Sequence, residues 1–245
     1  MRIEIWSDIV CPWCYIGRAR LQKALDAFEH RDEVQLVYKA FELDPSAPTD
    51  RTELTRDVLG RRYGGGEAQI RAMFSQVEQA GAQDGLDLRL EETHSGNTRH
   101  AHRMVKLAAQ SDRAGAMLEH LYKAYFTDGR NVFTTEDLVE LATEVGLDAA
   151  EARQTLESGA FEAEIQGDIR DAQRIGARGV PFFVVDGRFG ISGAQPADVF
   201  SQALQQAWDS RPKLQTVGAT TAQTGAADAA ACGPDGCEIP HQPQR

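Results

Sequence analysis

Hydrophobic and polar residues alternate along the first six positions, with Ile3 and Ile5 on one face, which predicts a β-strand. From Pro12 to His30 there is no further proline, and apolar residues recur on one helical face: Ile16, Leu21, Ala24, Leu25 and Phe28. Residues 33–41 predict a second strand. Strand, helix and strand within about 40 residues predict a βαβ unit, which is right-handed by default.

The middle of the chain has the periodicity of helices. Apolar positions predict helices over 51–63, 67–80, a segment capped by Asn97, 114–126, a segment capped by Thr134 or Thr135 and stopped by Gly146, 149–156 and 161–175. Residues 86–90 alternate and predict a short extended piece. We therefore expect a large, all-helical insertion over residues 46–175.

The pattern changes back after residue 175. Residues 179–191 predict two short strands joined at Asp186-Gly187, a strong hairpin signal. Pro196 opens a last helix that runs through Trp208. The outer segments, 1–45 and 176–210, are expected to form one α/β domain with a single sheet flanked by helices, and the insertion is expected to pack beside it.

The residues from 211 to 245 differ in composition from the rest. No aromatic residue follows Trp208, and the run 217–231 is small and polar, which predicts a flexible tail. The tail carries Cys232 and Cys237 around a Pro-Asp-Gly turn, so a disulfide between them is sterically reasonable.

Candidate chemistry begins at Cys11-Pro12-Trp13-Cys14, between the first strand and the first helix. A helix N-terminus stabilises an anion, and the thiolate is the reactive form of cysteine. Cys14 lies one turn further on, at a Cα separation of about 5 Å, within reach of a disulfide. We predict that Cys11 attacks a disulfide and that Cys14 resolves the mixed disulfide. Pro12 and Trp13 are predicted to tune the pair and to contact the substrate.

The cysteines allow two other interpretations, a metal site and a pair of buried structural thiols. A lone C-x-x-C supplies two ligands where a closed zinc site needs four, and Cys232, Cys237 and His241 supply three on the tail. Buried structural cysteines have no need of Pro-Trp between them at a helix start. Redox chemistry is therefore favoured, with no metal site, and the tail pair is predicted to exchange with the first.

Composition narrows the classes of function. The chain has 245 residues, of which 42% are hydrophobic and 26% charged, as in ordinary globular proteins. A formal net charge of -11 disfavours nucleic-acid binding, and no segment is long enough to span a membrane. The first strand leaves no room for a signal peptide, so a cytoplasmic location is expected. Four cysteines in a reducing compartment indicate catalysis or metal binding.

Together these motifs resemble a known family. The order of elements, the stretch from Ser7 to Cys14, Phe41-Glu42-Leu43-Asp44-Pro45, Asn97-Thr98 with Ala101-His102-Arg103, and the tail cysteine pair resemble the FrnE-like group of the DsbA-like branch of the thioredoxin superfamily. The resemblance covers the chain up to about residue 208, and the tail motif extends it.

The resemblance implies a thioredoxin fold and a thiol–disulfide oxidoreductase or isomerase. Its partners would be disulfide-containing or thiol proteins. No cofactor would be tightly bound, and glutathione or another thiol would serve as electron partner. It also implies a cis bond between Val180 and Pro181 that faces the cysteines, with the backbone of Val180 offered to an extended substrate.

The same branch contains glutathione-dependent kappa-class transferases and 2-hydroxychromene-2-carboxylate isomerases. These typically carry serine at the position of Cys11 and lack the second cysteine, so the dithiol favours disulfide exchange over them. A glutathione-dependent isomerase or transferase remains the alternative, and a metal-binding, chaperone-like protein is a further one. Asp8, three residues before Cys11, is either a proton acceptor or a turn cap. His94, His100 and His102 are expected to pack or to lie on the surface.

Overall fold

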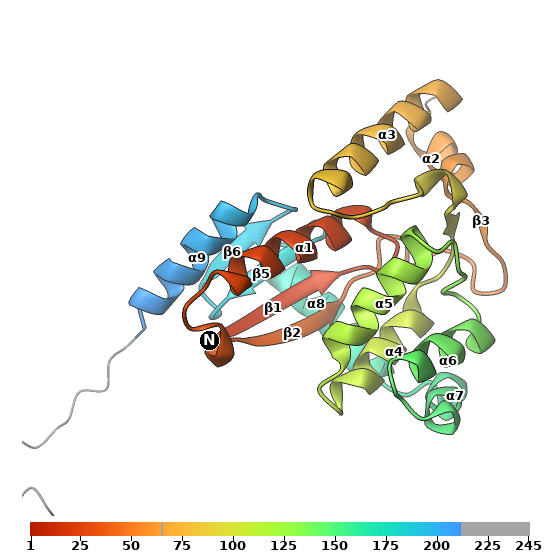
Figure 1. The fold of residues 1–245 in the computed structure, drawn as a ribbon. Coiled ribbons are helices and arrows are strands. Elements are labelled where there is room, and N and C mark those ends of the chain that lie inside the picture. The colour runs from red at the N-terminus through yellow and green to blue at the C-terminus, as the bar shows by residue number, and fades with distance from the viewer. Residues whose placement is uncertain (65, 212–245) are drawn as a thin grey trace, which may run out of the picture. The chain divides into compact units, whose positions relative to one another are not determined.

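A four-stranded sheet forms the centre of the protein, whose computed structural model describes residues 1–64 and 66–211 (Figure 1). The strand order is β2-β1-β5-β6. Strands β1 (Arg2–Ser7) and β2 (Gln35–Ala40) are parallel, and β5 (Phe182–Val185) lies antiparallel to β1 and to β6 (Phe189–Ser192). This is the sheet of the predicted βαβ and ββα segments, and the predicted thioredoxin fold is confirmed.

Helices cover both faces of this sheet. Ile3 and Ile5 of β1 pair with Val185 and Phe183 of β5, and these four side chains pack against α1 (Pro12–Asp26) and α9 (Ala197–Asp209). Trp6 points to the opposite face, where α8 (Glu162–Arg174) packs. The alternation of side chains along a strand thus divides the apolar residues between two layers.

The hairpin between β5 and β6 turns at the predicted dipeptide. Asp186 has φ 54° and Gly187 φ 67°, so both central residues are in the left-handed region that a type I′ turn needs. Glycine and aspartate tolerate this region better than most residues do. The hairpin is therefore confirmed.

The long middle segment is mainly helical. Its helices are α2 (Thr55–Tyr63), α3 (Glu67–Gln83), α4 (Arg99–Ala109), α5 (Ala114–Phe126), α6 (Thr135–Glu144) and α7 (Ala149–Ser158), followed by α8. Thr134 caps α6 by accepting a hydrogen bond from the N–H of Asp137. The structure thus confirms the helical character of this segment.

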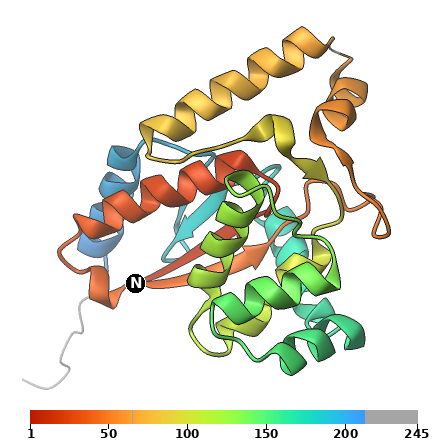
Figure 2. The same ribbon diagram turned by 45° about the vertical axis from the view of Figure 1, so that its right-hand side comes forward.

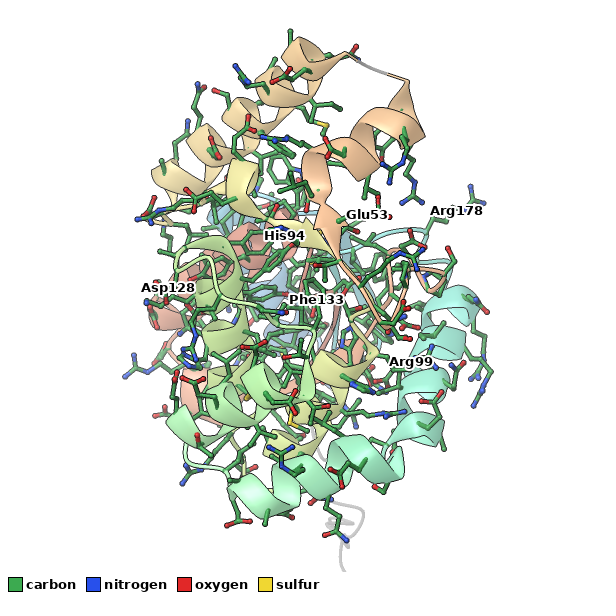
Figure 3. The ribbon with its side chains drawn as sticks, turned by 90° about the vertical axis from the view of Figure 1, so that its right-hand side faces the viewer. Glu53, His94, Arg99, Asp128, Phe133 and Arg178 are labelled. Atoms are coloured by element: carbon green, nitrogen blue, oxygen red, sulfur yellow. The ribbon has the colours of Figure 1, made fainter. Side chains whose placement is uncertain are left out.

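Three details of the sequence prediction were wrong. The insertion is not all-helical, because β3 (Glu53–Leu54) and β4 (His94–Ser95) pair as a small antiparallel sheet; Glu53 and His94 are labelled in Figure 3. Residues 86–90 lead into a 3₁₀ turn, Leu90–Glu92, and another, Arg31–Glu33, delays β2. The short pairing joins segments 40 residues apart, so no local pattern signals it.

The helical segment packs onto the N-terminal end of α1. One buried cluster joins Cys11, Cys14 and Ile16 of α1 with apolar residues of α3, α4, α5, α6 and α7. Figure 2 shows α3 on one side of α1 and the group α4 to α7 on the other. Residues Met1–Arg211 form one compact unit, and the proposed division into two domains stays a prediction.

Asp168 fastens α8 to the sheet and to α4. Its buried carboxylate accepts the N–H of Ala40 at 2.9 Å and pairs with Lys39 at 3.0 Å and with Lys106. Its carbonyl oxygen accepts the indole N–H of Trp6 at 2.9 Å. A buried charge is tolerated here because two ammonium groups and an amide satisfy it.

The predicted tail and its cysteines, Cys232 and Cys237, lie outside the residues that the structure describes. The same holds for His241.

Candidate active site

Cys11 lies at the N-terminus of α1, directly after the turn that follows β1. It is the N-cap residue, with extended backbone angles, and Pro12 occupies the first turn. The N–H of Cys11 bonds to the carbonyl of Asp8 at 3.1 Å, which closes the turn between strand and helix. The first turn of α1 holds no acidic residue, so no carboxylate there competes with a thiolate for the positive end of the helix.

The loop before β5 faces Cys11, as predicted. The Val180–Pro181 bond is cis, and the Cys11 thiol donates to the carbonyl oxygen of Val180 at 3.6 Å. The loop and α1 approach so closely that a Cβ on Gly17 would lie 3.0 Å from Cγ of Pro181. Glycine at position 17 therefore allows Val180 to reach the sulfur.

Cys14 lies behind Cys11 in the core. It is 2% exposed, against 4% for Cys11, and both are free thiols. Burial raises the pKa of Cys14 well above its ordinary value, and the hydrogen bond with Cys11 and the negative charges nearby raise it further. Cys14 is therefore held as a neutral thiol until its proton is taken.

Asp8 places a carboxylate inside this core. It is 1% exposed, and its Oδ2 accepts the N–H of Leu43 at 2.8 Å. Its Oδ1 is buried and has no hydrogen-bond partner among residues 1–64 and 66–211. The carboxylate faces Cys14 closely enough to raise the pKa of that thiol. An unpaired buried carboxylate oxygen is costly and points to a function.

His102 and Tyr122 both contact Asp8, the first at its carboxylate and the second at its main chain. Nε2 of His102 lies 3.0 Å from the carbonyl oxygen of Phe41 and 3.4 Å from Oδ1 of Asp8. A carbonyl oxygen only accepts, so Nε2 carries the proton. The hydroxyl of Tyr122 donates to the carbonyl oxygen of Asp8 at 3.4 Å. Burial raises the pKa of Tyr122, which keeps it neutral.

A cavity of about 340 Å³ opens beside Cys11 and is called the dithiol cavity here. Its walls come from both parts of the molecule: Cys11, Trp13 and Val180 on one side, and α2, α3 and α5 on the other. Its apolar lining includes Leu59, Met73, Phe74, Val77, Leu90 and Phe126. The predicted substrate-binding residues Pro12, Trp13 and Val180 line it, whereas Pro181 lies behind Val180 against Gly17.

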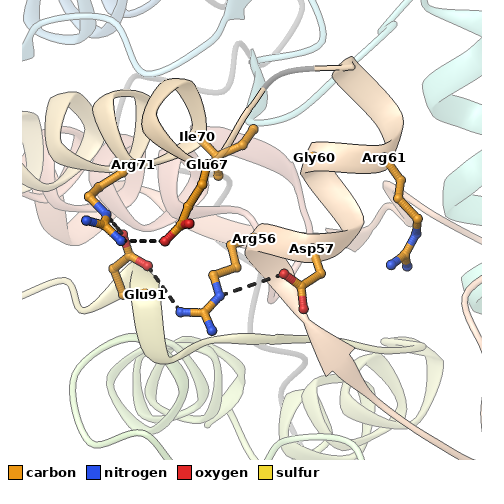
Figure 4. A pocket seen from close by; sticks show the side chains of 8 residues that line it. All are labelled: Arg56, Asp57, Gly60, Arg61, Glu67, Ile70, Arg71 and Glu91. Carbon is orange, nitrogen blue, oxygen red and sulfur yellow. Dashed lines mark hydrogen bonds and ion pairs between the residues drawn. The ribbon is translucent and has the colours of Figure 1, made fainter.

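A second pocket, of about 460 Å³, lies between α2 and α3 and is charged (Figure 4). Arg71 pairs with Glu67 at 2.6 Å and with Glu91 at 3.5 Å, and Arg56 pairs with Glu91 at 3.7 Å. These opposite charges pair with one another, and no thiol lines the pocket. The ion pairs of this pocket link α2 and α3 through Glu91.

Sequence reasoning missed most of the cavity wall. Met73, Phe74 and Val77 lie in the helix that the sequence predicts over 67–80, but a core face and a cavity face have the same periodicity, so the pattern does not mark them as cavity wall. His102 was expected to pack or to lie on the surface; it is buried, and nothing in the sequence placed it against Asp8. The predicted cysteines Cys232 and Cys237 cannot be placed in this site.

A dithiol at a helix start, opposite a cis-proline loop on this sheet, defines a thioredoxin-fold protein of the thiol oxidoreductase class. Comparison with known proteins agrees. Residues 2–205 match the DSBA-like thioredoxin domain family. A probable DsbA oxidoreductase from Streptomyces coelicolor is 45% identical with a TM-score of 0.84, over 98% of this chain and 100% of that one. The chain therefore belongs to the DsbA-like family of oxidoreductases.

Two more distant relatives extend the comparison. The uncharacterised protein YwbO of Bacillus subtilis is 25% identical over 209 residues, covering 83% of this chain and 96% of YwbO. The cytosolic disulfide reductase DsbM of Pseudomonas aeruginosa, solved with GSH, is 21% identical with a TM-score of 0.58, over 85% of this chain and 100% of DsbM. At 21% identity, the likeness to DsbM shows the fold alone. The narrower resemblance to the FrnE-like group stays a prediction.

In the described part of the chain, no helix is both long and apolar enough to cross a bilayer. Within residues 1–64 and 66–211, His, Cys, Asp and Glu side chains form no group of three that could hold a metal ion.

The raised pKa of Cys14 predicts unequal alkylation of the two cysteines. With a pKa above the ordinary 9.0, less than about a tenth of Cys14 is thiolate at pH 8. Iodoacetamide added to the reduced protein at pH 7–8 should therefore modify Cys11 and leave Cys14 intact, as measured by peptide mass spectrometry. Equal labelling of both cysteines in folded protein would contradict this assignment.

Proposed function

We propose that this protein is a thiol–disulfide oxidoreductase or isomerase that acts on the disulfides of other proteins through Cys11 and Cys14. The observation that carries the proposal is the placement of Cys11 at the start of α1, 3.6 Å from the carbonyl of Val180, with Cys14 buried behind it. A nucleophile at the surface of the core and a resolving thiol within it are the two parts that disulfide exchange needs.

The reaction has two steps. The Cys11 thiolate attacks one sulfur of the substrate disulfide, which forms a mixed disulfide and releases the other substrate sulfur as a thiol. Cys14 then loses its proton and attacks the sulfur of Cys11, so the Cys11–Cys14 disulfide forms and the second substrate thiol leaves. The substrate gains two electrons and the enzyme loses two. Two molecules of glutathione, or one molecule of a dithiol, return these two electrons to the enzyme.

Asp8 is proposed as the acceptor of the Cys14 proton. Its Oδ1 is buried and accepts no hydrogen bond from the described residues, and its charge helps to raise the pKa of Cys14, the thiol whose proton must leave. The Nε2–H of His102, at 3.4 Å, steadies the carboxylate without neutralising it. Of the two roles that the sequence allowed for Asp8, this geometry favours proton acceptor, although its carbonyl also closes the turn to Cys11.

The glutathione-dependent isomerase remains the alternative. Its structural counterpart, a 2-hydroxychromene-2-carboxylate isomerase, is 17% identical and shares the fold. We prefer disulfide exchange because Cys14 stands next to Cys11 in the core. We also propose a cytoplasmic location, where glutathione keeps thiols reduced.

Substitution of Cys11 tests the proposed function. Insulin reduction with glutathione as electron donor should fall to the uncatalysed rate in Cys11→Ser, because a serine hydroxyl forms no disulfide. Cys14→Ala should instead accumulate a mixed disulfide between Cys11 and insulin, detected by non-reducing electrophoresis. Undiminished activity of Cys11→Ser would refute the proposal. If the protein turns over an aromatic substrate with glutathione, and Cys14→Ala retains that activity, the isomerase is favoured.

The role of Asp8 predicts a pH signature. In Asp8→Asn the side chain still accepts the N–H of Leu43, but Cys14 must lose its proton to solvent. Release of substrate from the mixed disulfide should slow by about 10²-fold at pH 7 and recover as the pH rises. Rapid-quench measurement of that step checks this result.

Asp26→Asn, which alters an exposed carboxylate at the C-terminal end of α1, is the matched control. It should leave the rate and its pH profile unchanged. If the pH profile of Asp8→Asn runs parallel to that of the wild-type protein, Asp8 has a structural role only.

The tail cysteines complete the proposal. Cys232 and Cys237 are proposed to exchange disulfides with Cys11 and Cys14, because a linker of small residues tethers them to α9 and makes the reaction intramolecular. In Cys14→Ala, a bridge from Cys11 to Cys232 or Cys237 should accumulate and appear in peptide maps. If no such bridge forms, and deletion of residues 211–245 leaves the reduction rate unchanged, the tail takes no part.

A further inference from the structure

The loop that follows β2 supplies a hydrogen-bond donor to Asp8. Residues 41–48 form no helix or strand, and the N–H of Leu43, within this loop, bonds to Oδ2 of Asp8 at 2.8 Å. A hydrogen bond from an N–H group favours the anionic form of a carboxylate, which is the form that can accept a proton. The position of Leu43 therefore bears on the proposed role of Asp8.

Helix α4 holds this loop through a buried ion pair. Arg99, the first residue of α4, makes two hydrogen bonds to the carboxylate of Glu42, one of them from Nε to Oε1 at 3.1 Å (Figure 3). The Glu42 side chain is 2% exposed, and Glu42 directly precedes Leu43. A bidentate pair fixes orientation as well as position. A further bond, from Arg99 to Glu162 of α8, fixes the guanidinium in turn.

Two more side chains fasten the loop to the N-terminal part of α4. His102 lies one turn along α4, and its Nε2–H bonds to the carbonyl oxygen of Phe41 at 3.0 Å. Asn97 donates from Nδ2 to the carbonyl oxygen of Ala47 at 3.3 Å, and its N–H donates to that of Pro48 at 3.2 Å. The loop is thus held at both of its ends, with the Glu42 ion pair between them.

The other titratable groups that face Asp8 do not compensate its charge. Burial raises the pKa of three of these groups, and the charge of Asp8 is among the further causes: Cys14 of α1, and Tyr122 and Tyr125 of α5. All three are neutral near pH 7, so none supplies a positive charge. Stabilisation of the Asp8 anion depends instead on the N–H of Leu43 and on Nε2 of His102, 3.4 Å from Oδ1.

We propose that Arg99 is a positioning residue for the transfer of a proton from Cys14 to Asp8. Through its ion pair with Glu42, Arg99 holds the N–H of Leu43 against Oδ2 and so favours the carboxylate over the carboxylic acid. Apolar residues at positions 42 and 99 would cost less to bury, but they would not orient the loop. This inference rests on the proposed function and adds Arg99 and Glu42 to the residues on which the second step depends.

A double substitution tests the proposal. Glu42→Met with Arg99→Met replaces the ion pair by apolar side chains, so no buried charge is left without its partner. The reduced protein is mixed with excess 2-hydroxyethyl disulfide and quenched in acid, and mass spectrometry follows the products. Attack by Cys11 forms a mixed disulfide and releases one 2-mercaptoethanol. Attack by Cys14 then forms the Cys11–Cys14 disulfide and releases the second, so the two steps are measured separately.

The two steps should respond differently to the double substitution. Attack by Cys14 should slow by about tenfold at pH 7, because a hydrogen bond to a charged group is weakened, and the deficit should shrink as the pH rises. Attack by Cys11 should be unchanged. Arg99→Lys keeps the charge but loses the two-point contact with Glu42, so its rate should lie between those of the wild-type protein and the double variant. It also keeps the test valid if the double variant fails to fold.

Arg103→Met is the matched control. Arg103 also lies on α4, but its guanidinium bonds to Glu162 of α8 at 3.0 Å and to the carbonyl oxygen of Leu156 of α7 at 3.3 Å. Its loss removes a partly buried charge from the same helix without touching the ion pair to the loop. Both steps, and the pH profile of the second, should therefore match those of the wild-type protein.

The outcomes separate this inference from the proposed function. If the folded double variant performs both steps at the wild-type rates at every pH, Arg99 does not position Asp8, and disulfide exchange through Cys11 and Cys14 stands. Equal slowing of both steps without pH dependence, or an equal loss in Arg103→Met, would assign the ion pair a structural role only and overturn the inference. If the wild-type protein forms no mixed disulfide at all, the proposed function fails.

Discussion

The close approach between α1 and the loop before β5 governs the rest of the active site. A side chain at position 17 would press on Pro181 and on Phe183, 3.0 and 3.2 Å away, so the backbone of α1 meets the loop directly. That contact holds Val180 against the sulfur of Cys11. Because interiors are close-packed, a methyl group added at this point would force Pro181 to shift by a few tenths of an ångström. The position of the loop relative to Cys11 therefore depends on a van der Waals contact at Gly17, more than one helical turn away.

The two thiols differ by environment and not by type. Cys11 caps the positive end of a helix, whereas Cys14 lies in the core beside a buried carboxylate. Desolvation keeps Cys14 protonated, and the buried Asp8, whose Oδ1 accepts no hydrogen bond from the described residues, is the proton acceptor that we propose. If Cys14 ionised too readily, the disulfide would close too early; if it ionised too slowly, the substrate would be released slowly. We infer that a buried thiol with a buried Asp near it limits both.

The helical segment adds a wall to a thioredoxin-type site. Ionic contacts fix it: Arg99 pairs with buried Glu42 and with Glu162, and Asp168 joins α8 to the sheet. Helix α2 differs, since it has no buried residue and is held mainly through α3 and the charged pocket. Ion pairs thus fix the helical segment to the sheet, whereas α2, none of whose residues is buried, lies on the wall of the dithiol cavity.

The sequence by itself determined the elements with strong local signals. Period-two alternation, Pro12 at a helix start and Asp186-Gly187 at a turn depend on neighbours in the chain, so β1, α1 and the hairpin followed from them. Cys11 and Cys14 were likewise readable, because one helical turn fixes their separation. The tertiary structure alone decided the rest. The β3–β4 pair, the contact of His102 with Asp8 and the cavity between Cys11 and Met73 all join residues distant in sequence. Packing brings such residues together, and a local pattern carries no record of which distant surface it will meet.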